Sequence, residues 1–399
     1  MKQLIDVCHS GTFLVAGRSP PTVRRSGRRG RLASSGTNRW LHYRIDRIAL
    51  LRALENELAT ESTKKKPFQI LALSGGGYLG LYAAEILARM EERAGRPIGS
   101  CFDLIAGASV GGILAAGVSL DVPAARMRDL FIERGRDIFS GRPRPKFGWI
   151  DAGRSVLGPK YDGQALRSVV SEIIGDQTML AACKHRLIIP AVNMTKGSVQ
   201  MFKTGHHPDF TLHPKRRLVD VVMATSAAPT YFPLAEVGAA HYADGGLVAN
   251  APDQCALHEA THFLKQDVCQ ISILSIGTTS TGFSLKRSLG RDLGSAKWMM
   301  RGRLLRTIVS SQQQLVDYML RHQLGERYLR IDATQSEEQQ ADLALDVADA
   351  NAQGTLLGLA EGSFQKVSAD PALQKFLTHK PDPPDFPGVT SAWIKRRAL

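Results

Sequence analysis

A serine flanked by glycines has the clearest chemical potential in this 399-residue sequence. Ser109 lies in the pentapeptide Gly107-Ala108-Ser109-Val110-Gly111, after an apolar run at 102–106 and before small residues at 111–120. In a nucleophile elbow the strand ends abruptly, and small residues two positions before and after the strained serine let strand and helix approach. We predict Ser109 as a nucleophile, with Gly107 and Gly111 as the elbow glycines. The alternative is an ordinary tight turn with a structural serine, because this short pattern also arises by chance.

A glycine loop precedes this serine. The segment Ser74-Gly75-Gly76-Gly77-Tyr78-Leu79-Gly80 follows an apolar run at 68–73 and opens a helical pattern. Consecutive glycines let backbone N–H groups converge at a helix N-terminus, where an anion binds. The missing Gly-Lys-Ser/Thr excludes a P-loop, and no acidic residue ends the second strand as a dinucleotide site requires. We therefore predict Gly75, Gly76 and Gly77 as an oxyanion hole.

An aspartate in a glycine turn is the third element. Asp244-Gly245-Gly246 follows the mostly apolar residues 239–243. An aspartate in a glycine turn at a strand end is often a turn-former that bonds its own backbone, and this reading stays open for Asp244 taken by itself.

These three elements, in this order and spacing, resemble the patatin-like phospholipase family, which has a G-G-G-x-x-G loop, a G-x-S-x-G elbow and a D-G-G/A motif. By position, the glycines 75–77 match the oxyanion loop, Ser109 the nucleophile and Asp244 the dyad aspartate. The segment 224–233, Ala-Thr-Ser-Ala-Ala-Pro-Thr-Tyr-Phe-Pro, is similar to the family's A-S-x-A-A-P-x-x-F-P stretch, with Thr225 as an extra residue. The matches cover about residues 68 to 282.

The resemblance implies a Ser-Asp dyad without a catalytic histidine. Asp244 would then accept the Ser109 proton and return it to the leaving group, which requires a pKa tuned by a partly desolvated site. The glycine loop would stabilise the tetrahedral oxyanion, and water would hydrolyse the acyl-enzyme. No cofactor and no metal are implied.

Two rival catalytic sites use histidines. A Ser-Asp-His triad in the α/β-hydrolase order would draw on His258, His262 or His322 after Asp244. The helix 253–265 also contains a literal H-E-x-x-H, His258-Glu259-Ala260-Thr261-His262, as in zinc peptidases. A zinc site needs a third ligand, and no G-x-x-H follows, so we interpret this motif as helix surface.

Alternating strand and helix patterns predict the fold that positions these residues. Apolar runs predict strands at 68–73, 102–106, 186–193, 199–204, 271–276 and 328–331, and helical periodicity predicts helices at 79–93, 111–120, 166–174, 218–226 and 253–265. This alternation is typical of α/β proteins with a mainly parallel sheet. Together with the resemblance it predicts a three-layer α/β/α patatin-like fold.

Charge is concentrated at the N-terminus. Residues 1–47 hold ten Lys and Arg against two Asp, which is +8 of the total +14 and leaves +6 for the other 352 residues. This extension is rich in Arg, Ser, Gly and Pro, so we predict partial disorder in residues 1–66. The mildly basic remainder suits a protein that approaches anionic lipid, although a solvated basic tail explains the charge equally well.

Cysteine usage and the lack of long apolar segments indicate the cellular compartment. The five cysteines are scattered and odd in number, as in a reduced cytoplasmic protein: Cys8, Cys101, Cys183, Cys255 and Cys269. No segment forms a signal peptide's apolar region or a run of about 18 apolar residues. We therefore predict a cytoplasmic protein that contacts the inner face of the membrane from its surface.

The pattern changes after residue 282. We predict a catalytic domain at 67–282 and a C-terminal helical region at 283–399 packed on it. Predicted helices at 296–309 and 310–324 include apolar residues interleaved with basic ones: Lys297, Trp298, Met299, Met300, Arg301, Arg303, Leu304, Leu305, Arg306, Ile308 and Val309. Such a basic amphipathic helix is suited to a lipid interface or a lid, and a core helix with a basic edge is the alternative.

The motifs favour a lipid acyl hydrolase that cleaves the carboxylic esters of membrane phospholipids. The compact arrangement, the strand at 328–331 and the acidic residues after it resemble the bacterial antiphage branch of the family, whose members are activated by cyclic dinucleotides. That resemblance implies a cyclic dinucleotide as activator and assigns no residues to it; we also predict a homo-oligomer and no binding of DNA or RNA. A catalytically idle lipid-binding signalling module on the same fold stays open.

Overall fold

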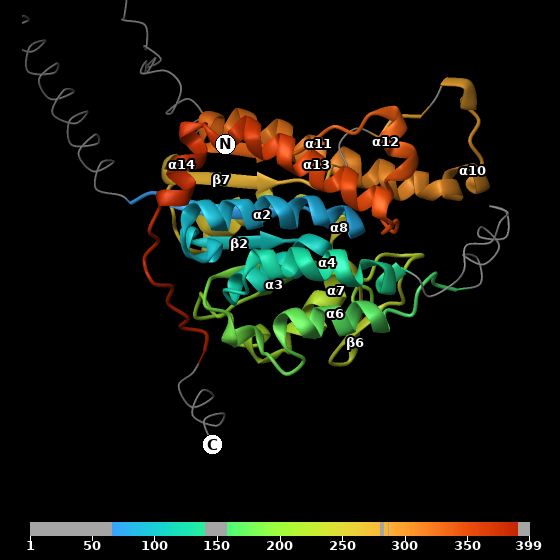
Figure 1. Ribbon diagram of the computed structural model, residues 1–399. Helices are drawn as coiled ribbons and strands as arrows, with labels where there is room; N and C mark the ends of the chain where they lie inside the picture. The colour runs from blue at the N-terminus through green and yellow to red at the C-terminus, as the bar shows by residue number, and fades with distance from the viewer. Residues whose placement is uncertain (1–65, 140–157, 280–282, 286, 390–399) are drawn as a thin grey trace, which may run out of the picture. The chain divides into compact units, whose positions relative to one another are not determined.

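The computed structural model describes residues 66–139, 158–279, 283–285 and 287–389 (Figure 1). The contacts within Lys65–Leu399 make it one compact unit. The predictions for residues 1–65 lie outside the described residues. The boundary between the catalytic domain and the C-terminal region at 282/283 stays a prediction.

One eight-stranded sheet runs through the described residues, in the order β5-β6-β3-β2-β1-β7-β8, with β4 paired to β3. β3, β2, β1, β7 and β8 are parallel, whereas β4, β5 and β6 are antiparallel to their neighbours. The strands span Phe68–Leu73 (β1), Leu104–Gly107 (β2), Leu187–Asn193 (β3), Ser198–Lys203 (β4), Ala235–Val237 (β5), Ala240–Asp244 (β6), Ile271–Ile276 (β7) and Tyr328–Ile331 (β8).

Alternation along β1 shows why the fold has three layers. Every residue of β1 is buried. Leu71 and Leu73 belong to a core with α2, α3, α4, α6, α7, α13 and α14, whereas Ile70 and Ala72 belong to a second core with α9 and α11. Because successive side chains of a strand point to opposite faces, the sheet is covered by helices on both sides. This confirms the three-layer α/β/α prediction.

The helices follow their predicted positions closely near the motifs. They span Gly80–Ala94 (α2), Val110–Ser119 (α3), Ala124–Phe139 (α4), Gln164–Ile174 (α6), Leu218–Thr225 (α7), Gly246–Ala249 (α8), Asp253–His258 (α9), Ser295–Met299 (α10), Arg303–Leu324 (α11), Glu337–Asp342 (α12), Ala350–Ser368 (α13) and Pro371–Thr378 (α14). Figure 1 shows α2 between α4 and α13, and α2 packs on both.

The predicted division of the basic helical segment is wrong. No break occurs at 309/310, since α11 is continuous from Arg303. The break lies instead at Gly302, which has a φ of 62° and separates α11 from α10. A left-handed glycine ends a helical path at no steric cost, so the break follows the backbone rather than the apolar pattern.

In the described part of the chain, no helix is both long enough and apolar enough to span a membrane.

Candidate active site

Ser109 lies in a strained turn between β2 and α3. β2 ends at Gly107 and α3 begins at Val110, and Ser109 between them has a φ of 53° and a ψ of −128°. A Cβ atom on Gly107 would lie 2.1 Å from the Gly111 carbonyl oxygen, and one on Gly111 would lie 2.2 Å from the Leu73 carbonyl oxygen. Strand and helix therefore need glycine at both positions, which is the geometry of a nucleophile elbow.

Asp244 lies within hydrogen-bonding distance of this serine although 135 residues separate the two in the chain. Ser109 Oγ donates to Asp244 Oδ2 at 2.7 Å. Asp244 ends β6, and its Oδ1 accepts the Gly246 N–H at 2.6 Å. Burial raises the pKa of Asp244 to about 6, against the two hydrogen bonds, which lower it. The carboxyl group is thus oriented, desolvated and poised to exchange a proton near neutral pH.

The Thr225 side chain links the elbow to two neighbouring elements by hydrogen bonds. Its Oγ1 accepts the Ser109 N–H at 3.0 Å and donates to the Pro190 carbonyl at 2.6 Å. The Ser109 amide is therefore engaged, and the elbow is tied to α7 and β3. In the sequence Thr225 was visible only as an additional residue in the Ala-Thr-Ser segment, with nothing to indicate this contact.

The three loop glycines differ in what their N–H groups do. The Gly75 N–H donates to the Asn250 carbonyl at 2.9 Å, so it is already engaged. Among the described residues, no acceptor bonds the N–H of Gly76 or Gly77. Gly77 has a φ of 55°, and a Cβ there would lie 2.3 Å from the Leu345 carbonyl oxygen. Only glycine fits this approach.

Two side chains hold the peptide between Gly75 and Gly76. The Gly75 carbonyl accepts from Thr278 Oγ1 at 2.7 Å and from Asn250 Nδ2 at 3.2 Å. In a trans peptide the N–H of the next residue points away from the carbonyl oxygen. Anchoring this oxygen therefore directs the Gly76 N–H to the opposite side. Thr278 follows β7, which lies beside β1, so both strands deliver their carboxyl ends to this edge.

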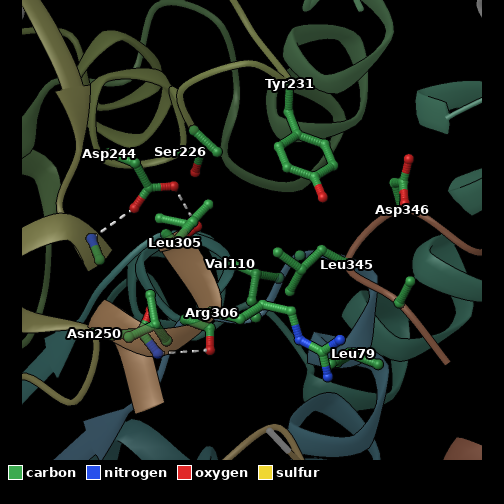
Figure 2. Close-up of a pocket in the computed structure, with 18 of the residues that line it drawn as sticks. Leu79, Val110, Ser226, Tyr231, Asp244, Asn250, Leu305, Arg306, Leu345 and Asp346 are labelled. Carbon is green, nitrogen blue, oxygen red and sulfur yellow. Dashed lines mark hydrogen bonds between the residues drawn. The ribbon is translucent and has the colours of Figure 1, made fainter. Parts of the chain in front are cut away.

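A cavity of about 580 Å³ is lined by Ser109, Asp244 and the glycine loop. Figure 2 shows part of its wall, with Asp244 among the labelled residues. This volume suits a ligand the size of a lipid chain or a drug molecule. Ser226, which also lines the cavity, is buried, and no described group bonds its hydroxyl. Most of the wall is apolar. Its residues come from the N-terminal and the C-terminal parts of the sequence, and they include Leu79, Ile113, Phe131, Ile138, Phe139, Leu166, Phe232, Leu305, Val309, Leu343 and Leu345.

The histidines of the rival sites lie elsewhere. His258, His262 and His322 are not among the residues that line the cavity. Glu259 is 2% exposed and accepts from Lys203 Nζ at 2.6 Å and His206 Nε2 at 3.0 Å. A glutamate held in a buried ion pair is not available as a zinc peptidase base. Over the described ranges, no three His, Cys, Asp or Glu side chains form a group that could hold a metal.

A serine that is hydrogen-bonded to a buried carboxylate, beside a glycine loop at one apolar cavity of an α/β fold, is the arrangement found in hydrolases of acyl esters. The family model for patatin-like phospholipases matches residues 71–254. A "cGAMP-activated phospholipase" of Pseudomonas aeruginosa is 43% identical over 325 residues, which cover 80% of this chain and 94% of that protein. A protein of the same description from Vibrio cholerae is 35% identical over 76% of this chain and 94% of its own length. The chain belongs to the patatin-like phospholipase family.

Proposed function

We propose that this protein is a phospholipase that cleaves carboxylic esters of membrane phospholipids through Ser109 and Asp244. The observation that carries the proposal is the 2.7 Å hydrogen bond from Ser109 Oγ to the buried carboxylate of Asp244. Family membership supports the substrate class. The cavity supports it as well, because its largely apolar wall suits an acyl chain.

The reaction follows from the positions of these groups. Ser109 Oγ attacks the ester carbonyl carbon while its proton passes to Asp244. The oxyanion then accepts hydrogen bonds from the free N–H groups of Gly76 and Gly77. The predicted oxyanion hole of three glycines is thereby reduced to two donors, because the Gly75 N–H already bonds the Asn250 carbonyl. Collapse breaks the ester bond, and Asp244 returns its proton to the leaving alcohol. Water, deprotonated by Asp244, then releases the fatty acid from Ser109.

We propose a cyclic dinucleotide as activator, within an antiphage response. Two relatives that match this chain along 94% of their own length carry the description "cGAMP-activated phospholipase". The test is release of fatty acid from phospholipid vesicles with and without cyclic GMP-AMP and other cyclic dinucleotides. Release that depends on one of them supports both parts of the proposal. If fatty acid is released at the same rate with and without each dinucleotide, the proposed activation is refuted. If no fatty acid is released under any condition, the proposed phospholipase activity is refuted.

The activity should depend on the ionisation of Asp244. Its pKa of about 6 means that the carboxylate, which is the form able to accept the serine proton, is lost as the pH falls through 6. kcat/KM should therefore level off above about pH 7 and fall about tenfold per pH unit below about 5. A pH profile on a soluble short-chain ester measures this without changes in vesicle binding. A profile that stays flat from pH 8 to pH 4 would exclude Asp244 as the base.

We propose that the outer face of α10 and α11 contacts the membrane from its surface. On α11, exposed apolar side chains lie at helical spacing, namely Leu304, Ile308, Leu315 and Met319, and Met299 and Met300 before Gly302 are exposed as well. α11 also contributes Leu305 and Val309 to the wall of the cavity that Ser109 lines, so a membrane at this face would lie close to the cavity. Basic residues along the two helices suit anionic lipid head groups.

Replacing Leu304 and Ile308 together with glutamine should weaken binding to anionic vesicles about tenfold or more. Each substitution removes about 1 kcal/mol of binding free energy, because an apolar side chain no longer inserts into the bilayer interface. Flotation with phosphatidylglycerol vesicles measures this, and hydrolysis of a soluble ester should stay unchanged. Leu212→Gln is the matched control, because Leu212 is 72% exposed on a different element. Equal binding by the double variant and the wild type would refute this contact surface.

The idle-module hypothesis makes a different prediction for Ser109. A module without catalysis would not react with a fluorophosphonate, whereas the activated serine proposed here would. A homo-oligomer stays a prediction.

A further inference from the structure

The charged side chains that line the cavity differ in whether they have a partner of opposite charge. Four acidic or basic side chains line it, namely Lys160, Asp244, Arg306 and Asp346. Asp346 Oδ2 accepts from Lys160 Nζ at 2.5 Å and from the Tyr161 hydroxyl at 2.8 Å. Asp244 bonds Ser109 and the Gly246 amide. Across the described residues, no carboxylate lies within ion-pair distance of Arg306, whereas Lys160 is paired with Asp346.

Arg306 is held where a ligand would meet it. It lies in the first turn of α11, between the cavity-lining residues Leu305 and Val309. Its guanidinium carbon lies 4.7 Å from the centre of the Phe283 ring, which also lines the cavity. Figure 2 shows the guanidinium extending among the side chains of the pocket. Burial lowers the pKa of Arg306, so the charged form has lost part of its hydration.

An unpaired, partly dehydrated guanidinium is a binding group for an oxyanion. Its planar fork donates two parallel hydrogen bonds to phosphate, and such charge-assisted bonds are stronger than neutral ones. A phospholipid carries its phosphate a few bonds from its ester carbonyls. With the acyl chain on the apolar wall and the carbonyl at Ser109, the phosphate would still lie within the lined cavity, where a cation can bind it.

We propose that Arg306 binds the head-group phosphate of the substrate and so selects phospholipids over uncharged acyl esters. This inference rests on the proposed phospholipase function. Arg306 would act by binding rather than by proton transfer. Its loss should therefore raise KM for phospholipid much more than it lowers kcat.

The test compares two substrates with the same acyl chains, phosphatidylcholine and diacylglycerol, in uncharged detergent micelles with cyclic GMP-AMP present. Arg306→Met should lower kcat/KM about 10- to 50-fold on phosphatidylcholine, mainly through KM, and less than twofold on diacylglycerol. Arg306→Lys should recover part of the loss, because it keeps the charge without the fork.

Arg126→Met is the matched control. Arg126 is exposed on α4, donates to Glu172 Oε1 at 2.7 Å and does not line the cavity, so neither substrate should be affected. Equal losses of Arg306→Met on both substrates, or no loss on either, would overturn the role of Arg306. A wild-type protein that cleaves neither substrate with any of the cyclic dinucleotides present would overturn the phospholipase proposal itself, so the two failures are distinguishable.

Discussion

Replacing Asp244 with asparagine should lower the rate of fatty-acid release about 10³-fold or more. Asparagine has nearly the same shape and can still accept the Gly246 N–H, which bonds Asp244 Oδ1 at 2.6 Å. It cannot take the proton of Ser109, however, so attack on the ester loses its general base. Among the described residues, no histidine lines the cavity to replace it. Release from phospholipid vesicles by purified variant and wild type measures the loss.

The same variant should be at least as stable as the wild type. The pKa of Asp244 is raised by burial to about 6, above its value in an unfolded chain, so ionisation above pH 6 costs folding free energy. Neutral asparagine does not incur that cost, and the melting temperature at pH 8 should not fall. Asp253→Asn is the matched control, because Asp253 is also buried but does not line the cavity. It should stay within about twofold of wild-type activity.

Replacing Thr278 with valine should lower kcat about 10- to 100-fold with little change in KM. The valine keeps the shape but removes the hydroxyl that donates to the Gly75 carbonyl at 2.7 Å. The adjoining Gly76 N–H then loses its fixed direction toward the developing oxyanion. A donor aimed at the transition state contributes about 10² to 10³ in kcat, and misdirecting it forfeits part of that. Steady-state kinetics on a soluble ester separate kcat from KM.

Two further variants distinguish positioning of the loop from a general loss of structure. Thr278→Ser restores the hydroxyl and should recover most of kcat. Thr261→Val removes a comparable hydroxyl, which donates to the Leu257 carbonyl at 2.9 Å. Thr261 does not line the cavity, so this variant should leave kcat unchanged. An unaltered kcat in Thr278→Val, or a fall in kcat that serine does not reverse, would contradict the positioning role.

The fold was largely predictable because its central strands are mostly apolar on both faces. The observed bounds of β1 and β7 are those predicted, since helices cover both faces of the sheet there, and β8 also has its predicted bounds although it contains Arg330. Short β5 is only three residues long and half-exposed, so it carries no such run. α4 and α13 were not predicted, and both pack on α2, where tertiary contacts support them.

Ser109 and Asp244 were also recognisable as candidates in the sequence, because Ser109 follows a strand, Asp244 ends one, and both lie beside glycines. The side chains that position the site were not. Thr225, Asn250 and Thr278 act by bonding backbone groups of the loop and elbow, and no sequence pattern records which carbonyl a hydroxyl or amide will reach. Their roles emerge only when β1, β7 and α7 are assembled.

Mass spectrometry of the acyl-enzyme tests the dyad most directly. Wild-type protein quenched with acid during phospholipid turnover should carry one acyl group on the peptide that contains Ser109. Ser109→Ala should carry none and release no fatty acid above the uncatalysed rate. An acyl group on any other residue, or sustained release by Ser109→Ala, would contradict Ser109 as the nucleophile.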